Sequence, residues 1–184
     1  QKGEIAFLGR IGKNKGVLDL IHAFSKVKKA CPAATLKLAG DGEIDSYNKV
    51  VSELGLTDSV DFLGWISGKE KELLLSSADI YCLPSYNEGF PMGVLEAMSA
   101  GIAVVASKAG GIPDAIEHGK EGLLIDAGDV DALAESLIKL INNRELNETY
   151  SQAAKEKFDS CFSTEVIMPQ LDALYAELLE RKAS

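Results

Sequence analysis

Residues 5–27 read IAFLGRIGKNKGVLDLIHAFSKV, a stretch in which three patterns follow one another. Residues 5–8 are an apolar run of the kind that forms a buried strand, and residues 9–16 are a loop rich in glycine and lysine. Apolar side chains then recur at the spacing of one helix face, at Val17, Leu18, Leu20, Ile21, Phe24 and Val27. A strand, a glycine-rich loop and a helix in this order indicate the first unit of a parallel α/β fold.

Five further short apolar runs, each bounded by Gly, Pro, Asp or Ser, predict strands at residues 35–39, 60–63, 79–83, 102–106 and 122–125. Segments long enough for helices lie between them. Alternating strands and helices are joined by right-handed crossovers, which place helices on both faces of a parallel sheet. We therefore predict the α/β class, with an open parallel sheet of about six strands and helices on both faces.

The chain has 184 residues, of which 46% are apolar and 26% charged, and this is the size of one soluble domain. After about residue 128 the pattern predicts helices only. Asp129 and Asp131 are both candidate caps for the first of these helices. We expect one domain over residues 1–184, with residues 129–184 as its helical tail. The chain begins with Gln1 rather than Met, which leads us to expect that it has been cut from a longer protein.

The net charge of −9 argues against a nucleic acid or an anionic membrane surface as the main partner. Residues 129–184 carry −5 of this charge, and residues 9–16 are a local exception with three basic residues and no acidic one. Any anionic ligand is therefore expected at this loop.

The three cysteines, Cys31, Cys82 and Cys161, have spacings that match neither a disulfide framework nor a zinc site. No apolar run approaches the roughly 18 to 20 residues of a membrane span. These observations favour a cytoplasmic protein.

Ligands of open parallel sheets bind outside the carboxyl ends of the strands, and the first such loop is residues 9–16. Its glycines allow close approach of a bulky anion, and Arg10 and Lys15 can donate charge-assisted hydrogen bonds to phosphate oxygens. The loop alone is equally compatible with a solvated basic turn, because it is neither a Walker A loop nor a GxGxxG dinucleotide motif.

The loop after the fourth strand contains Glu88, and the predicted helix that follows it contains Glu96. Pro91 fits the first turn of this helix, where the amides near Met92 and Gly93 would attract a phosphate. An ionised carboxylate is purely an acceptor, so either glutamate could bind sugar hydroxyls. The loop after the fifth strand is again rich in glycine, which serves either its turn or a ligand.

These segments together resemble the nucleotide-binding C-terminal half of a GT-B glycosyltransferase, with its Rossmann-like fold, and most closely the retaining glycosyltransferases of family 4. The resemblance covers nearly the whole chain. In chain order it is carried by Phe7-Leu8-Gly9-Arg10 with Lys15-Gly16, Leu38-Ala39-Gly40-Asp41-Gly42, Val60-Asp61-Phe62-Leu63-Gly64, Ala78-Asp79, Pro84-Ser85, Glu88-Gly89-Phe90 with Glu96-Ala97-Met98, Gly101, Gly110-Gly111-Ile112-Pro113 and Gly122-Leu123-Leu124.

The resemblance implies a role for each matching position. Arg10 and Lys15 would bind the diphosphate of a sugar nucleotide, Glu88 would contact the donor sugar, and these three residues would be catalytic. Glu96 would hold the ribose hydroxyls. The implied donor-binding set is Gly9, Arg10, Lys15, Trp65, Ile66, Glu88, Gly89, Phe90, Pro91, Met92, Gly93, Glu96, Gly110 and Gly111, with Trp65 and Ile66 at the base.

The resemblance also implies the partners. The donor would be a UDP-, GDP- or ADP-sugar, the acceptor a glycan or a lipid-linked acceptor, and an N-terminal acceptor-binding domain would be missing from this chain. We expect no cofactor and no bound metal, since the resemblance implies an enzyme that works without a metal and the sequence has no histidine cluster.

His22 and His118 are expected to have core or surface roles. The parent enzyme could be peripheral at the inner membrane face, without direct membrane contact by this half. Two alternatives remain open at this point: a non-catalytic nucleotide-sugar-binding or regulatory module, and half of a GT-B nucleotide-sugar epimerase.

Overall fold

The computed structural model describes residues 3–183 and contains one six-stranded sheet in which every pairing is parallel. The strands are β1 (Glu4–Leu8), β2 (Thr35–Ala39), β3 (Val60–Gly64), β4 (Ile80–Leu83), β5 (Ala103–Ser107) and β6 (Gly122–Ile125). Every boundary lies within one residue of the prediction, so the α/β fold class with an open parallel sheet is confirmed.

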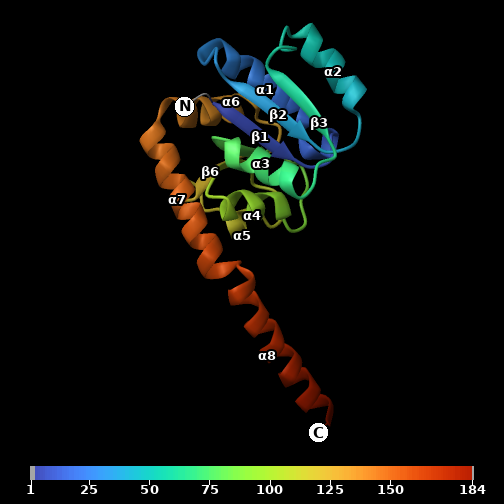
Figure 1. The fold of residues 1–184 in the computed structure, drawn as a ribbon, viewed down its shortest axis with the longest axis vertical. Coiled ribbons are helices and arrows are strands. Elements are labelled where there is room, and N and C mark those ends of the chain that lie inside the picture. Colours follow the sequence, from blue (N-terminus) through green and yellow to red (C-terminus); the bar gives the residue numbers. More distant parts are fainter. Residues whose placement is uncertain (1–2, 184) are drawn as a thin grey trace.

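Helices cover both faces of the sheet, as Figure 1 shows. The helices described are η1 (Lys13–Lys15), α1 (Val17–Ala30), α2 (Ile44–Glu53), α3 (Lys69–Ser77), α4 (Met92–Ser99), α5 (Ile112–Ala115), α6 (Val130–Asn142), α7 (Arg144–Cys161) and α8 (Thr164–Ala183). Helices α1 and α6 pack against each other on the far side of the sheet in Figure 1, and α3 and α4 lie on the near side.

One apolar residue of the first stretch does not join the core. Leu18 is 40% exposed, although we included it in the helix face that packs on the sheet. The residues four and eight positions further along α1 are His22 and Lys26, and both are exposed as well. Leu18 therefore lies on the solvent face of α1, because residues four apart share one side of a helix.

The structure decides between the two candidate caps of α6. The Oδ1 atom of Asp129 accepts a hydrogen bond from the Ala132 amide at 2.9 Å, as an N-cap residue does. Asp131 instead lies in the first turn of α6, where its carboxylate pairs with Lys26 of α1. Asp129 is thus the cap.

The strand order β3-β2-β1-β4-β5-β6 determines where a ligand can bind. The chain moves toward one edge of the sheet after β1 and toward the other edge after β4, so these two strands form the topological switch point. Open α/β sheets bind ligands in the crevice outside the carboxyl ends of the strands at such a point. The loops at residues 9–16 and 84–91 flank this crevice.

Backbone contacts fix these two loops against each other. The Tyr86 amide donates to the Asn14 carbonyl at 2.9 Å. Gly16 has a φ of +67°, and a Cβ at this position would lie 2.0 Å from the Pro84 carbonyl oxygen. A side chain at residue 16 would therefore separate the loops, which explains the need for glycine there.

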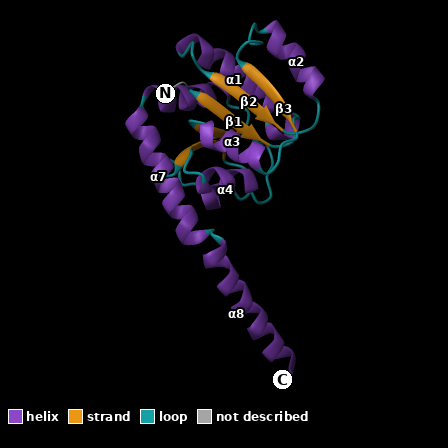
Figure 2. Cartoon of the chain, viewed as in Figure 1, coloured by secondary structure: helices purple, strands orange, loops and turns teal. Residues whose placement is uncertain are grey.

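The last helix, α8, extends away from the rest of the molecule (Figures 1 and 2). Its main contact is with α7. Apolar side chains along it remain between 37% and 69% exposed, namely Ile167, Met168, Leu171, Leu174, Tyr175, Leu178 and Leu179. Among the helices described, none is both long and apolar enough to cross a bilayer.

Candidate functional site

The most buried charged group at the switch point is Glu88, whose side chain is only 7% exposed. Its Oε1 atom accepts hydrogen bonds from the Lys15 ammonium at 2.6 Å and from the Ser85 hydroxyl at 2.7 Å. The side chain of Lys15 is 29% exposed and comes from the loop after β1. The fold thus brings together two of the predicted catalytic residues, which are 73 positions apart in the chain.

A second charged pair lies in a cavity of about 390 Å³. The Lys71 ammonium lies 2.7 Å from Oε1 of Glu96, and each side chain is about one-third exposed. Lys71 comes from α3 and Glu96 from α4. With Glu96, the cavity wall includes half of the fourteen predicted donor-binding positions, the others being Gly9, Arg10, Trp65, Ile66, Met92 and Gly93.

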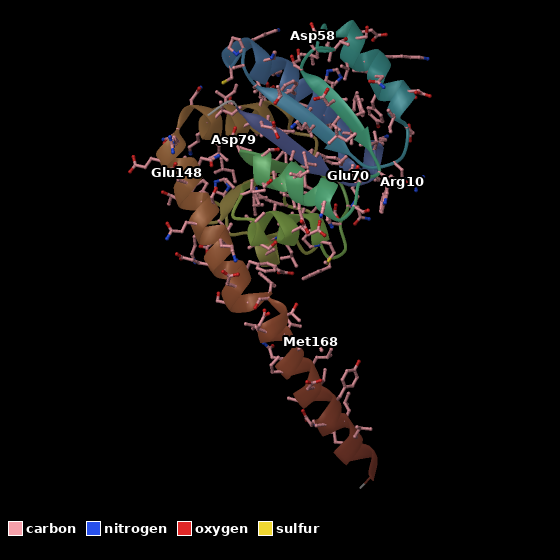
Figure 3. The ribbon with its side chains drawn as sticks, viewed as in Figure 1. Arg10, Asp58, Glu70, Asp79, Glu148 and Met168 are labelled. Carbon is pink, nitrogen blue, oxygen red and sulfur yellow. The ribbon has the colours of Figure 1, made fainter. Side chains whose placement is uncertain are left out.

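Arg10 connects this cavity to a neighbouring one. The neighbouring cavity, of about 360 Å³, is lined by residues 12–15, by Arg10 and by Glu43. Arg10 lines both cavities, is exposed, and lies at the end of the sheet toward which β1 and β2 point (Figure 3). Within residues 3–183 its guanidinium has no ion pair, so its five N–H donors are available to a ligand.

The start of α4 differs slightly from the prediction. Pro91 is the N-cap of α4 and not part of its first turn, and the amides of Val94 and Leu95 donate to its carbonyl. The Met92 amide donates to Phe90, which leaves the Gly93 amide as the first N–H of the described helix without a protein acceptor. This amide belongs to a cavity-lining residue and is a suitable phosphate donor.

The two glycines after β5 support the loop that carries Glu88. Gly110 has a φ of +50°, and a Cβ there would lie 1.7 Å from the Glu88 carbonyl oxygen. The Gly111 amide donates to the Gly89 carbonyl at 3.0 Å. Gly110 and Gly111 therefore contact the backbone of this loop directly, and their predicted contact with a ligand stays a prediction.

The side chain of Phe90 lies apart from the rest of the predicted set. It is 58% exposed and lines a third cavity with Met92, Leu95 and four residues near the start of α8, namely Phe162, Thr164, Ile167 and Met168. Met92 lines this cavity as well as the one that contains Glu96. The Phe90 side chain thus faces the base of α8 and does not line the Glu96 cavity, so only its backbone remains a candidate donor contact.

Three residues of the site were not found from the sequence: Lys71, Ser85 and Tyr81. Ser85 belongs to the Pro84-Ser85 motif but was given no role. Tyr81 is fully buried, and burial, together with the nearby Cys82, Glu96 and Glu88, raises its pKa. It remains protonated and donates to the Leu8 carbonyl at 3.2 Å, directly before Gly9. No periodic or motif signal marks Lys71 in the sequence Lys69-Glu70-Lys71-Glu72.

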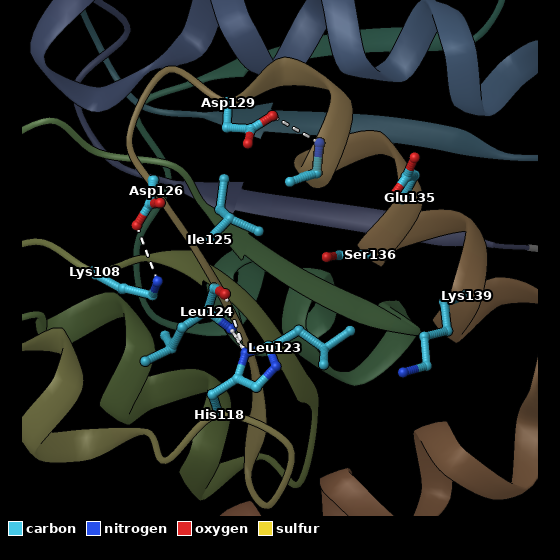
Figure 4. Close-up of a pocket in the computed structure, with 11 residues that line it drawn as sticks. Lys108, His118, Leu123, Leu124, Ile125, Asp126, Asp129, Glu135, Ser136 and Lys139 are labelled. Atoms are coloured by element: carbon cyan, nitrogen blue, oxygen red, sulfur yellow. Dashed lines mark hydrogen bonds and ion pairs between the residues drawn. The ribbon is translucent and has the colours of Figure 1, made fainter.

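Another cavity, of about 320 Å³, lies between β6 and α6 (Figure 4). It is lined by paired charges such as Lys108 and Asp126, whose side chains lie 3.0 Å apart, and it contains none of the predicted site residues. His118 lies here, and its Nδ1 atom accepts from the Leu124 amide at 3.0 Å. Within the described part of the chain, no cluster of three or more His, Cys, Asp or Glu side chains could hold a metal ion.

Comparisons with known proteins identify the family of this chain. The chain is 34% identical over 168 residues to the N-acetyl-alpha-D-glucosaminyl L-malate synthase of Bacillus anthracis, a match that covers 91% of this chain and 43% of that protein. The chain therefore spans less than half the length of this curated relative.

Two solved structures show the same fold. The HepE protein of Anabaena, solved in complex with UDP, superposes with a TM-score of 0.88 at 26% identity, over 95% of this chain and 48% of that one. The C-terminal domain of a glycosyl transferase group 1 family protein from Francisella tularensis, LpcC, superposes with a TM-score of 0.81 at 27% identity, over 88% of this chain and 86% of that one. The equivalent domain of that relative was thus crystallised without the rest of its protein.

The family described as "Glycosyl transferases group 1" matches residues 1–157. This range includes the sheet, both charged pairs and every predicted site residue. The chain belongs to the glycosyl transferases group 1 family.

Proposed function

We propose that this chain is the donor-binding domain of a glycosyltransferase that transfers a sugar from a nucleoside diphosphate to a glycan or a lipid-linked acceptor. The observation that carries the proposal is the meeting of Arg10, Lys15, Glu88 and Glu96 at the switch point of the sheet. The UDP complex of the structurally similar HepE protein supports a nucleotide as the ligand. The donor class is a UDP-, GDP- or ADP-sugar.

In this proposal the residues near Glu88 bind the diphosphate and the donor sugar, and the residues near Glu96 bind the nucleoside. Arg10 and Lys15 neutralise the diphosphate, and Glu88 contacts the donor sugar next to them. The leaving diphosphate gains negative charge as the glycosidic bond breaks, so cations placed there stabilise the transition state more than the ground state. Glu96 accepts hydrogen bonds from the ribose, and Trp65 and Ile66 in the same cavity contact the base.

We further propose that the transfer retains the anomeric configuration and needs no bound metal. Family resemblance supports retention, by attack of the acceptor on the face from which the diphosphate leaves. The two cations near the phosphate position support the second point, because they can supply the charge that a divalent ion would supply. Full activity in the presence of a chelator would agree with it.

The acceptor site is assigned to a further domain of a longer enzyme. The length of the curated relative supports this, and so does α8. Pro169 lies inside α8 and removes one of its backbone hydrogen bonds, and helices in proteins gain most of their stability from the packing of an apolar face. We propose that the acceptor domain packs against the exposed apolar side chains of α8.

The proposed setting is the cytoplasm, with the longer enzyme peripheral at the inner membrane face when its acceptor is lipid-linked. The free cysteines support a reducing compartment, since Cys31 and Cys82 are buried and Cys161 is exposed, without a disulfide among them. The net charge of −9 supports a domain that does not itself bind an anionic membrane.

The proposal is tested by titrating the chain with a UDP-, a GDP- and an ADP-sugar while following its backbone amides by NMR. We expect one of the three to bind at or below millimolar concentration and to shift the amides of Arg10 and Gly93. Arg10→Ala should weaken binding about tenfold or more, because a hydrogen bond to a charged group contributes about 1.5–3 kcal/mol. Lys29→Ala, on the exposed surface of α1, removes the same charge and is the control.

In the enzyme that contains these residues, Lys15→Ala should lower kcat by about a hundredfold, the effect of losing one transition-state contact of this kind. Failure of all three sugar nucleotides to bind would contradict the donor site. Unchanged turnover in Lys15→Ala would contradict the catalytic role of Lys15, and nucleotide binding without any turnover would favour a non-catalytic module.

A further inference from the structure

A hydroxyl group is both a hydrogen-bond donor and an acceptor, so a site that uses both functions must offer it an acceptor and a donor side by side. Glu96 is an acceptor only, because an ionised carboxylate has no proton to donate. Lys71 is a donor only, because an ammonium has no free lone pair. The pair made by these two side chains offers both partners within 2.7 Å of each other.

The surroundings place this pair on the cavity wall and not on open surface. Lys71 and Glu96 both line the cavity of about 390 Å³ that also contains Gly9, Arg10 and Trp65. Their side chains are 34% and 32% exposed, which leaves each of them accessible to a ligand in the cavity. They belong to different helices, so the pair exists only in the folded protein.

Neither side chain is saturated by the contact that joins them. Lys71 uses one of its three N–H donors on Oε1 of Glu96, and its side chain has no further hydrogen bond within residues 3–183. Glu96 keeps its Oε2 atom and a second acceptor direction on Oε1. A hydroxyl can therefore dock against the pair without breaking it.

We infer that Lys71 is a further nucleotide-binding residue, and that a ribose hydroxyl of the bound nucleotide donates to Glu96 while it accepts from Lys71. This inference rests on the proposed function, since it needs a nucleotide in the cavity. It adds a second ribose contact from α3, a helix that supplies no residue to the predicted site. A nucleotide that lacks this hydroxyl leaves both charges without their shared ligand.

The test takes the nucleoside diphosphate that the chain binds among UDP, GDP and ADP, and compares it with its 2′-deoxy and 3′-deoxy analogues by NMR titration of the chain and of two variants. We expect the chain to bind this nucleotide at least about tenfold more tightly than one of its deoxy analogues, as is typical for the loss of a charge-assisted hydrogen bond. Lys71→Met keeps the length of the side chain and removes its charge, and it should reduce that ratio to about threefold or less.

The matched control is Lys69→Met, because Lys69 is exposed at the start of the same helix and does not line the cavity. It should leave the ratio unchanged. A purely structural role of the Lys71 to Glu96 pair would lower the melting temperature of Lys71→Met without changing the ratio.

An unchanged ratio in Lys71→Met, with the nucleotide still bound, would overturn the inference and leave the proposed function standing. Absence of UDP, GDP and ADP binding to the unmodified chain would instead overturn the proposed function, and the inference with it.

Discussion

Glu88 and Glu96 are the same type of residue in different environments. Glu88 is 7% exposed and accepts two hydrogen bonds on one oxygen, from Lys15 and Ser85. Glu96 is 32% exposed and accepts one, from Lys71. A mostly buried carboxylate needs such partners to offset its lost hydration, whereas one that is one-third exposed can exchange them with solvent or ligand. Glu88 is therefore held in one position, and Glu96 is freer to adjust to a ligand.

The loop that carries Glu88 depends on Gly110, and this dependence can be measured. We expect Gly110→Ala to destabilise the chain by about 2–4 kcal/mol, because its φ is positive and its Cβ would lie 1.7 Å from the Glu88 carbonyl oxygen. Urea unfolding gives the free energy of unfolding, and nucleotide titration should show weaker binding.

Gly119→Ala separates the two causes in that experiment. Gly119 also has a positive φ, of +84°, but nothing lies within 4 Å of its Cβ position. Gly119→Ala should lower the free energy of unfolding only by the cost of the left-handed backbone conformation, about 1–2 kcal/mol. Equal losses in the two variants would show that the contact with the Glu88 backbone does not matter.

At the residue scale, the sequence indicated candidate residues of the site but not the contacts between them. Glycines, cations and glutamates in loops after strands mark Lys15 and Glu88 as candidates. Their hydrogen bond depends on the order of β1 and β4 in the sheet. Lys71 was missed for the same reason, since its partner Glu96 is 25 positions away on another helix.

Helix α6 provides a prediction at the scale of one element. Its N-cap is Asp129, and we expect Asp129→Ala to lower the free energy of unfolding by about 1 kcal/mol, since the Ala132 amide would lose its acceptor. Asp131→Ala removes an equally exposed carboxylate in the first turn and should cost less, because exposed ion pairs contribute little. Urea unfolding of both variants measures the difference. A larger loss in Asp131→Ala would contradict the assignment of the cap.

Elements were the most predictable part of this fold. Strands β4, β5 and β6 are buried at every position, and a continuous apolar run bounded by Gly, Pro or Asp is the pattern that such strands need. The sequence predicted less well which apolar residues at the edge of a helix face are buried. Leu18 lies next to the buried face of α1 and still points to solvent, which its apolar character alone does not reveal.

At the scale of the whole molecule, α8 stands outside the core. We expect a chain that ends at Met168 to melt within a few degrees of the complete chain, because the segment removed packs against almost nothing in residues 3–168. The shortened chain should also associate less with itself, since exposed apolar patches promote association. Thermal unfolding and sedimentation velocity measure the two effects.

A fall in melting temperature of more than about 10 °C would show that α8 stabilises the domain. In a domain of this size, a loss of about 1 kcal/mol in the free energy of unfolding lowers the melting temperature by about 2–4 °C. A fall of about 10 °C would therefore require more contacts between α8 and the rest of the domain than the structure describes.

The contact between the loops at residues 9–16 and 84–91 affects how the donor preference of this domain can change by substitution. The hydrogen bond between Tyr86 and Asn14 and the close approach of Gly16 to Pro84 both involve main-chain atoms. Side chains that make no contact between the two loops can therefore be replaced without altering these main-chain contacts. A new donor preference can therefore arise, in evolution or in a designed library, by changing side chains such as Trp65 and Ile66 one at a time.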